Sequence, residues 1–128
     1  MMGQDRIRVL TADDHALIRE GLAMMINHQP DMTVVSQASG GTEAIQQYRE
    51  HRPDITLMDL RMPDLSGIDA LTAIRAEFPD ARVIVLTTFD GDADVRRALD
   101  AGACAFLLKS ASPGTLLGAI RKAVGRTT

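Results

Sequence analysis

Five polar residues follow closely on apolar runs of the sequence, and their side chains suit one kind of chemistry. They are Asp13, Asp14, Asp59, Thr87 and Lys109. Three carboxylates that meet at one place repel each other, which raises their pKa values unless a cation neutralises them. A hard divalent cation prefers oxygen ligands, and Mg²⁺ commonly takes one or two carboxylates together with water and phosphate. The pattern therefore predicts a Mg²⁺ site that handles a phosphoryl group.

Asp59 is the candidate nucleophile of this group, since it ends the apolar run in DITLMDLRMPDLSG. Lys109 would supply a point charge for the phosphoryl group, and Thr87 a hydroxyl donor for one of its oxygens. A carboxylate aimed at phosphorus in such surroundings would form an aspartyl phosphate. One aspartate at a strand end is more often a helix N-cap, so the prediction rests on all five residues together.

These residues can meet only if the apolar runs are neighbouring strands. We predict strands over residues 7–10, 32–35, 55–58, 83–86 and 105–108, the fourth deep in the sheet. A helix is predicted after each strand. Three helices are predicted from apolar stripes, which are Leu17, Ile18, Leu22, Met25 and Ile26; Ile68, Leu71 and Ile74; and Leu116, Leu117, Ile120 and Val124. The helix over residues 42–51 is stopped by Pro53, and the helix with Asp92 and Asp94 near its start has Arg96 and Arg97 further along, which suits the helix dipole.

Regular alternation of strands and helices with short connections predicts a parallel sheet covered by helices on both faces. In such folds the functional site lies outside the carboxyl ends of the strands. The five polar residues all follow predicted strand ends, so they should gather along one rim of the sheet. Asp64 and Asp69, in contrast, are interpreted as turn and helix-start residues, with Pro63 shaping the loop.

Composition limits the class of protein. With 128 residues, 45% of them apolar and 24% charged, the chain matches one soluble globular domain. A net charge of −3, with one tyrosine, three phenylalanines and no tryptophan, argues against a nucleic-acid surface on this chain. There is neither a membrane-length apolar run nor a signal-like N-terminus, so we expect a cytoplasmic protein without a membrane partner. Cys104, the single cysteine, lies in an apolar run and is expected in the core.

The chain resembles a response-regulator receiver domain from the first predicted strand to the last helix. The resemblance rests on the pair Asp13-Asp14, on MDLRMPDLSGIDAL around Asp59, on LTT with Thr87 and on GACAFLLKSAS with Lys109. The segments DDHALIREGL and LLKSASPGTLLGAI look most like the NarL/FixJ subfamily, whose members usually carry a C-terminal LuxR-type helix-turn-helix. The resemblance implies an α/β, flavodoxin-like (βα)5 three-layer sandwich with a five-stranded parallel sheet of order 2-1-3-4-5.

The resemblance also implies roles for the acidic residues. Asp59 would accept a phosphoryl group from a sensor histidine kinase. Mg²⁺, or Mn²⁺ in its place, would be bound by the side chains of Asp14 and Asp59 and by the backbone carbonyl of Arg61. Asp13 would act on the metal through a water molecule.

Thr87 and Lys109 would contact the phosphoryl oxygens, and Thr87 with Phe106 would form the switch that reshapes a distant surface. Phe106 stands where many receivers have a tyrosine, so the hydroxyl on which such a switch can rely is absent at this position. Ser110 stands where many have proline, and we expect the Lys109–Ser110 bond to be trans or a strained cis bond. Arg61 and Phe89, each two positions beyond a site residue, are expected to tune the phosphoryl lifetime.

Residues 1–128 are interpreted as a single receiver domain, the N-terminal part of a longer transcription regulator. DNA would then be a partner only through an output domain outside this chain, and phosphorylation would promote a homodimer. Two alternatives stay open: a stand-alone receiver that serves as an interaction module, and a Mg²⁺-dependent phosphatase. The phosphatase would need an acid/base group two residues beyond Asp59, where Arg61 cannot act as a base. We therefore predict a signalling phosphoacceptor and not an enzyme.

Overall fold

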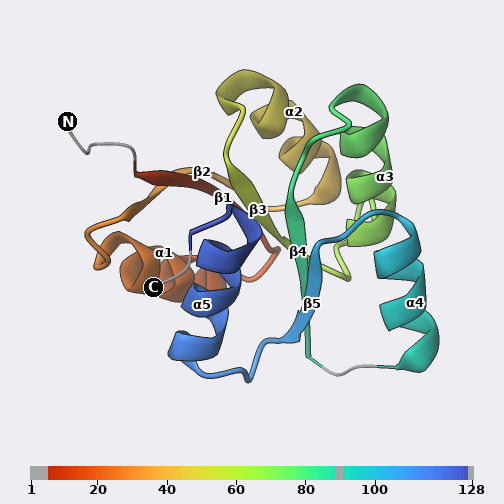
Figure 1. Ribbon diagram of the computed structural model, residues 1–128. Coiled ribbons are helices and arrows are strands. Elements are labelled where there is room, and N and C mark those ends of the chain that lie inside the picture. The colour runs from red at the N-terminus through yellow and green to blue at the C-terminus, as the bar shows by residue number, and fades with distance from the viewer. Residues whose placement is uncertain (1–5, 89–90, 127–128) are drawn as a thin grey trace.

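Five strands alternate with five helices in the computed structural model, which describes residues 6–88 and 91–126 (Figure 1). In chain order they are β1 (Ile7–Ala12), α1 (Ala16–Asn27), β2 (Met32–Ala38), α2 (Gly41–His51), β3 (Ile55–Asp59), α3 (Gly67–Glu77), β4 (Val83–Thr87), α4 (Asp92–Asp100), β5 (Ala105–Leu108) and α5 (Pro113–Ala123). The strands form one parallel sheet in the order β2-β1-β3-β4-β5. The predicted fold class and strand order are confirmed.

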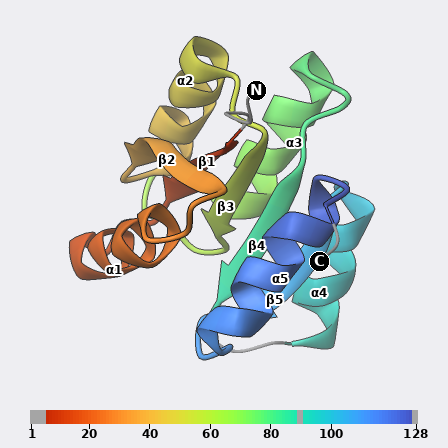
Figure 2. The same cartoon turned by 60° about the vertical axis from the view of Figure 1, so that its left-hand side comes forward.

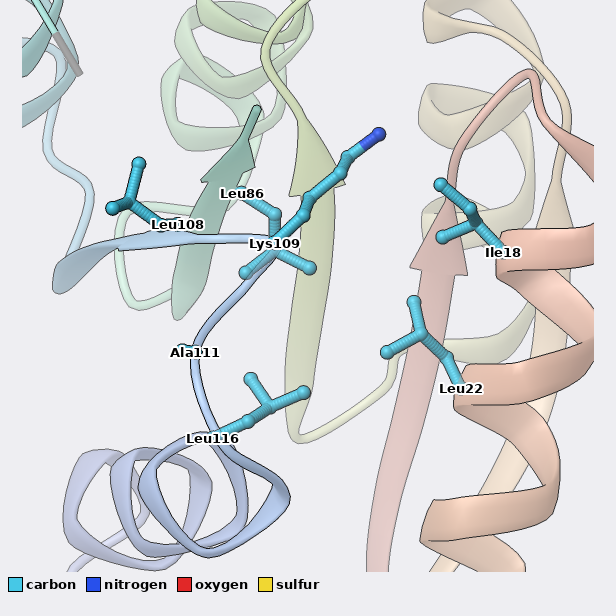
Figure 3. Close-up of a pocket in the computed structure, with 7 residues that line it drawn as sticks. All are labelled: Ile18, Leu22, Leu86, Leu108, Lys109, Ala111 and Leu116. Atoms are coloured by element: carbon cyan, nitrogen blue, oxygen red, sulfur yellow. The ribbon is translucent and has the colours of Figure 1, made fainter. Parts of the chain in front are cut away.

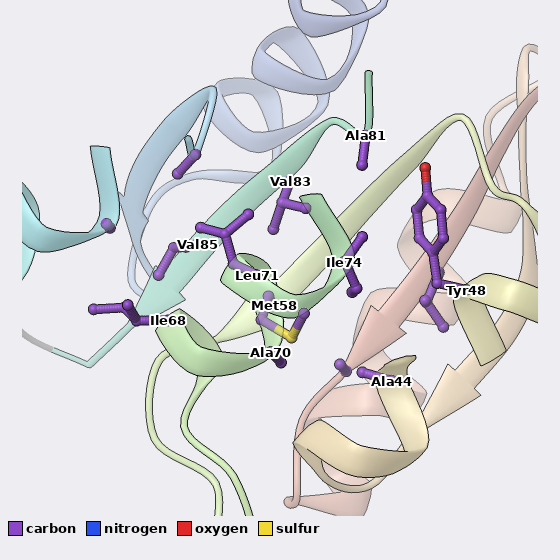
Figure 4. Packing of buried hydrophobic residues seen from close by; sticks show 14 of the residues in the cluster. Ala44, Tyr48, Met58, Ile68, Ala70, Leu71, Ile74, Ala81, Val83 and Val85 are labelled. Carbon is purple, nitrogen blue, oxygen red and sulfur yellow. The ribbon is translucent and has the colours of Figure 1, made fainter. Parts of the chain in front are cut away.

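The helices cover both faces of the sheet, α1 and α5 on one and α2, α3 and α4 on the other (Figure 2). On the second face Leu71 and Ile74 of α3 pack in one cluster with Val83 and Val85 of β4 (Figure 4). Every residue of β3 and β4 is buried, which explains their continuous apolar runs. Within the described ranges, no helix has the length and apolar character needed to cross a membrane.

Several strands run further than their apolar cores and so reach the polar residues. β3 ends on Asp59 itself and β4 on Thr87. The ladder even continues past β4 and β5, because the N–H of Lys109 donates to the carbonyl of Thr87 at 2.6 Å. Polar side chains are thus placed by strand hydrogen bonds and not by free loops.

The helix α1 buries a narrower face than predicted. Ile26 is fully buried, and Leu22 and Met25 pack against the same core cluster. The prediction for Leu17 was wrong, because its side chain is 82% exposed. Leu17 therefore lies outside the helix face that packs on the sheet, whereas the adjacent Ile18 is partly buried.

Two further expectations are decided near β5. Cys104 was expected in the core but is exposed, with its thiol hydrogen-bonded to the Val83 carbonyl at 3.3 Å. It precedes the last strand in the sheet order, whose outer edge has no neighbouring strand to cover it. All peptide bonds in the described parts of the chain are trans, so the Lys109–Ser110 bond is trans and not a strained cis bond.

Candidate functional site

Two buried carboxylates and one ammonium meet at the carboxyl edge of the sheet. Asp13 follows β1 and is 1% exposed, and Asp59 ends β3 and is 5% exposed. The Nζ atom of Lys109, just beyond β5, lies 2.7 Å from Oδ2 of Asp13 and 3.2 Å from Oδ1 of Asp59. Three of the five predicted residues are therefore in direct contact, as the alternation of strands and helices implied.

Negative charge exceeds positive charge in this cluster. Burial raises the pKa of Asp59 above its ordinary value, and repulsion from Asp13 adds to the rise although Lys109 opposes it. Burial works to lower the pKa of Lys109, but its hydrogen bond to Asp13 and the charge of Asp59 outweigh burial and raise that pKa. The lysine is thus firmly protonated, while one ammonium leaves two neighbouring carboxylates incompletely neutralised.

Asp14 and His15 extend the cluster toward solvent. The Nδ1 atom of His15 lies 3.1 Å from a carboxylate oxygen of Asp13 and 3.1 Å from one of Asp14. The His15 side chain is 64% exposed. Its contacts with both acids were not predicted, although its place directly after them in the sequence was the available signal.

The cluster could hold a metal ion. Asp13, Asp14, His15 and Asp59 each offer one ligand atom, and these atoms all lie within 4.8 Å of one another. Three of the four donors are carboxylates, which suits a hard divalent cation such as Mg²⁺ or Mn²⁺ better than a soft one. The uncompensated charge described above is also what such a cation would neutralise. A ligand role for the Arg61 carbonyl stays a prediction.

Thr87 ends β4, the strand next to the one that carries Asp59, and Phe106 lies in the neighbouring strand β5. Thr87 is buried, and it is one residue beyond Leu86, the register partner of Asp59. Phe106 is half-buried and is the register partner of Val85, which lies two residues before Thr87 in β4. Phe106 and Thr87 therefore lie on the same face of the sheet. The positions suit a coupled pair, and the switch role itself stays a prediction.

The aliphatic stem of Lys109 is held on the opposite face of the sheet. It lines a cavity of about 50 Å³ between α1 and α5, together with apolar side chains such as Ile18, Leu22 and Leu116. Figure 3 shows the Lys109 nitrogen pointing away from these apolar side chains. Packing of the stem therefore directs the ammonium toward the acids.

The loop between β3 and α3 is fastened on its α2 side by Asp64. Its two carboxylate oxygens accept the N–H groups of Gly41 and Thr42, each at 3.0 Å, at the start of α2. Hydrogen bonds from Thr42 and Gly41 lower the pKa of Asp64 to about 2. Asp64 is thus more than the turn residue predicted, whereas Asp69 does lie in the first turn of α3, where its N–H donates to Ser66.

On its other side the same loop is joined to α4. The Nη2 atom of Arg61 lies 3.1 Å from Oδ2 of Asp94, and Nη1 of Arg97 lies 3.5 Å from Oδ1. This contact was not predicted, and no spacing signal exists for a pair 33 residues apart. Phe89, expected to act with Arg61, is outside the described residues.

Comparison with known proteins adds the family. The model of the response regulator receiver domain matches residues 9–121. The uncharacterized transcriptional regulatory protein YxjL of Bacillus subtilis is 43% identical over 122 residues, which are 95% of this chain and 56% of YxjL. This chain thus spans little more than half the length of that relative.

Solved structures agree with the sequence relatives. A two-component response regulator of the LuxR family from Aurantimonas sp. superposes with a TM-score of 0.90 at 37% identity, over 95% of this chain and 88% of that one. A chain in the CheX–CheY–BeF3–Mg²⁺ complex from Borrelia burgdorferi superposes with a TM-score of 0.85 at 26% identity, over 91% of this chain and 87% of that one. The LuxR-family resemblance expected from the sequence is confirmed.

Proposed function

The chain belongs to the response regulator receiver domain family, and from that premise we propose that Asp59 is its phosphoacceptor. One arrangement carries the proposal: the Lys109 ammonium contacts both Asp59 and Asp13 in a buried cluster at the carboxyl edge of the sheet. A buried carboxylate beside a fixed positive charge is suited to attack phosphorus, because the charge attracts the anionic phosphodonor and stabilises the transferred group.

In the proposed reaction a carboxylate oxygen of Asp59 attacks the phosphorus atom of the donor. A phosphorus–oxygen bond to Asp59 forms as the bond to the leaving group breaks, and the leaving group departs with its electron pair. Lys109 then contacts an oxygen of the new phosphoryl group, and the Thr87 hydroxyl donates to another. A bound divalent cation supplies further positive charge for this transfer.

Asp13, Asp14 and Asp59 are the residues we propose to hold that cation, with the Arg61 carbonyl as a further ligand. The acidic cluster and its excess negative charge support this assignment. The Borrelia burgdorferi complex contains Mg²⁺ together with BeF3 by its description, and this chain resembles one of its components. The oxygen-rich donor set favours Mg²⁺ or Mn²⁺.

The partners of the whole protein are also proposals. Response regulators receive phosphoryl groups from sensor histidine kinases, and we assign that donor class to this chain. The matched region is 56% of YxjL, which is described as an uncharacterized transcriptional regulatory protein. We therefore place residues 1–128 as the receiver of a transcription regulator whose LuxR-type output domain binds DNA, with a homodimer favoured by phosphorylation. Thr87 and Phe106 would pass the signal to the dimer surface.

Phosphorylation is tested directly by intact mass. The 128-residue chain is incubated with acetyl phosphate and Mg²⁺, and we expect the mass of one added phosphoryl group. Asp59→Asn should abolish the gain, whereas Asp69→Asn, at a nearby helix start, should not. An unphosphorylated wild type, or a gain that survives Asp59→Asn, would refute the proposal. Absence of phosphorylation together with unchanged partner binding would favour the interaction module instead, and rapid turnover of a phosphate ester would favour the phosphatase.

A further inference from the structure

Arg61 links the proposed phosphorylation site to the helix α4. Its guanidinium, 68% exposed, pairs with the Asp94 side chain, which is 18% exposed and lies in the first turn of α4. Arg97 approaches the other oxygen of Asp94 from within the same helix. Asp94 therefore has two guanidinium partners, one from its own helix and one from the loop that follows Asp59.

Arg61 is also within reach of Asp59. Two residues span at most about 7 Å of chain, a distance that an extended arginine side chain can cover. The Arg61 backbone N–H already interacts with the Asp59 carboxylate and works to lower its pKa. A cavity of about 210 Å³ separates the loop from α4, and Arg61, Ser66 and Asp94 are among the residues that line it. The guanidinium therefore has room to turn from one partner to another.

The two sets of contacts that hold the loop between β3 and α3 differ in strength. Asp64 binds two backbone N–H groups of α2, which hold fixed positions in the helix. Arg61 and Asp94 form a side-chain pair open to water, the kind of contact that contributes little and exchanges readily. A new charge at Asp59 would therefore disturb the connection to α4 before the connection to α2.

The helix α4 is lightly held apart from this pair. Among residues 93–100, whose burial the structure describes, Ala98 alone is buried. Its N-cap is Gly91, which has no side chain to bind the first N–H groups of the helix. The pair with Arg61, although weak, therefore contributes to fixing the start of α4.

We propose that Arg61 is shared between Asp94 and the phosphoryl group on Asp59, and that phosphorylation transfers it from the first to the second. The inference rests on the proposed function. A phosphoryl group carries about −1.5 to −2 charges and accepts a guanidinium through two oxygens, so it competes well with a single carboxylate. Asp94 keeps Arg97, and the start of α4 is released. Arg61 is then a phosphoryl-binding residue whose availability Asp94 sets.

Because binding effects are reciprocal, removing Asp94 should strengthen the hold of Arg61 on the phosphoryl group. The chain is phosphorylated with acetyl phosphate and Mg²⁺, the donor is removed, and loss of the phosphoryl group is followed by intact mass. We expect Asp94→Asn to lose it two- to fivefold more slowly than wild type, a factor of about the size expected for an exposed ion pair. Asp100→Asn, at the exposed end of the same helix, should match wild type.

A double variant separates Arg61 from general charge effects. Arg61→Gln removes the guanidinium and leaves the backbone carbonyl unchanged. The double variant Arg61→Gln with Asp94→Asn should lose its phosphoryl group at the same rate as Arg61→Gln alone. Hydrogen exchange adds a second readout: amides of residues 92–100 should exchange faster in Arg61→Gln than in wild type before any phosphorylation, and faster in wild type once phosphorylated.

The results that would overturn the inference are distinct from those that would overturn the function. A wild type that takes up no phosphoryl group removes both. A wild type that is phosphorylated on Asp59, with Asp94→Asn losing the group as fast as Asp100→Asn, removes only the sharing of Arg61. A slower loss in Asp94→Asn that persists in the double variant also removes it, since Arg61 would not carry the effect.

Discussion

Lys109 lies closer to Asp13 than to Asp59, at 2.7 Å against 3.2 Å. The ammonium therefore joins β1 to β5 across the two intervening strands, in addition to facing the proposed phosphoacceptor. It stabilises a pair of buried acids before any phosphoryl group or cation arrives. Lys109 should consequently matter for stability as well as for phosphoryl transfer.

Replacing Lys109 by methionine should destabilise the fold by about 2 kcal/mol at pH 7 without Mg²⁺. The change leaves the buried carboxylates of Asp13 and Asp59 without their ammonium partner. Because Asp59 can take up a proton, the loss of folding free energy is smaller than for a buried charge that stays ionised and unpaired. Urea unfolding gives the free energy. Lys122→Met, on an exposed part of α5, should stay within about 0.5 kcal/mol of wild type. Equal stability of the two variants would show that the Lys109 pairs contribute nothing.

Replacing Asp14 by asparagine should weaken Mg²⁺ binding at least about tenfold, because a carboxylate ligand is lost. A metal that binds only the folded state raises its stability with concentration, so the melting temperature of wild type should rise as Mg²⁺ is added. The rise should need higher Mg²⁺ in Asp14→Asn and be unchanged in Asp100→Asn. A melting temperature of wild type that does not respond to Mg²⁺ would contradict the assigned metal site.

The strand ends could be predicted because their signals are local. An apolar run that stops at Asp59 or Thr87 identifies the end of a buried strand, and parallel topology brings such ends together. The acid cluster with Lys109 follows from that reasoning alone. The order of the strands came from the family resemblance and not from the runs.

Other features depend on contacts that leave no mark in the spacing of residues. Leu17 and Ile18 are equally apolar, yet Leu17 is exposed and Ile18 is partly buried, a difference that the place of the sheet decides. Asp64 meets Gly41 from 23 residues away, so it reads as an ordinary turn residue in the sequence. Cys104 lies in an apolar run, and its exposure follows from the edge position of β5, which only the folded sheet reveals.

Asp64 should make part of the stability dependent on acid pH. Its pKa is about 2 in the folded chain, below the ordinary 3.8, so the unfolded state binds the proton more readily. The contribution of Asp64 is therefore fully present above about pH 4 and is lost as the pH falls toward 2. Asp64→Asn should be less stable than wild type at pH 7, with a difference that shrinks across this range. Urea midpoints measured from pH 7 to 2 test this, and a constant difference would exclude the titration of Asp64 as its cause.

Gly67 should be the least replaceable glycine of the site. A Cβ atom there would lie 2.1 Å from the carbonyl oxygen of Asp59, because the first turn of α3 presses against the end of β3. Gly67→Ala must push the strand end or the helix aside, which costs about 1–3 kcal/mol and displaces the proposed phosphoacceptor.

Gly118 in α5 provides the matched control, since nothing lies within 4 Å of a Cβ atom added there. Gly118→Ala should stabilise the chain by about 0.5–1 kcal/mol, the usual gain of alanine over glycine inside a helix. Urea unfolding of the two variants should therefore give changes of opposite sign, and only Gly67→Ala should slow phosphorylation by acetyl phosphate. If Gly67→Ala kept both the stability and the phosphorylation rate of wild type, the close approach of α3 to Asp59 would not be what positions that carboxylate.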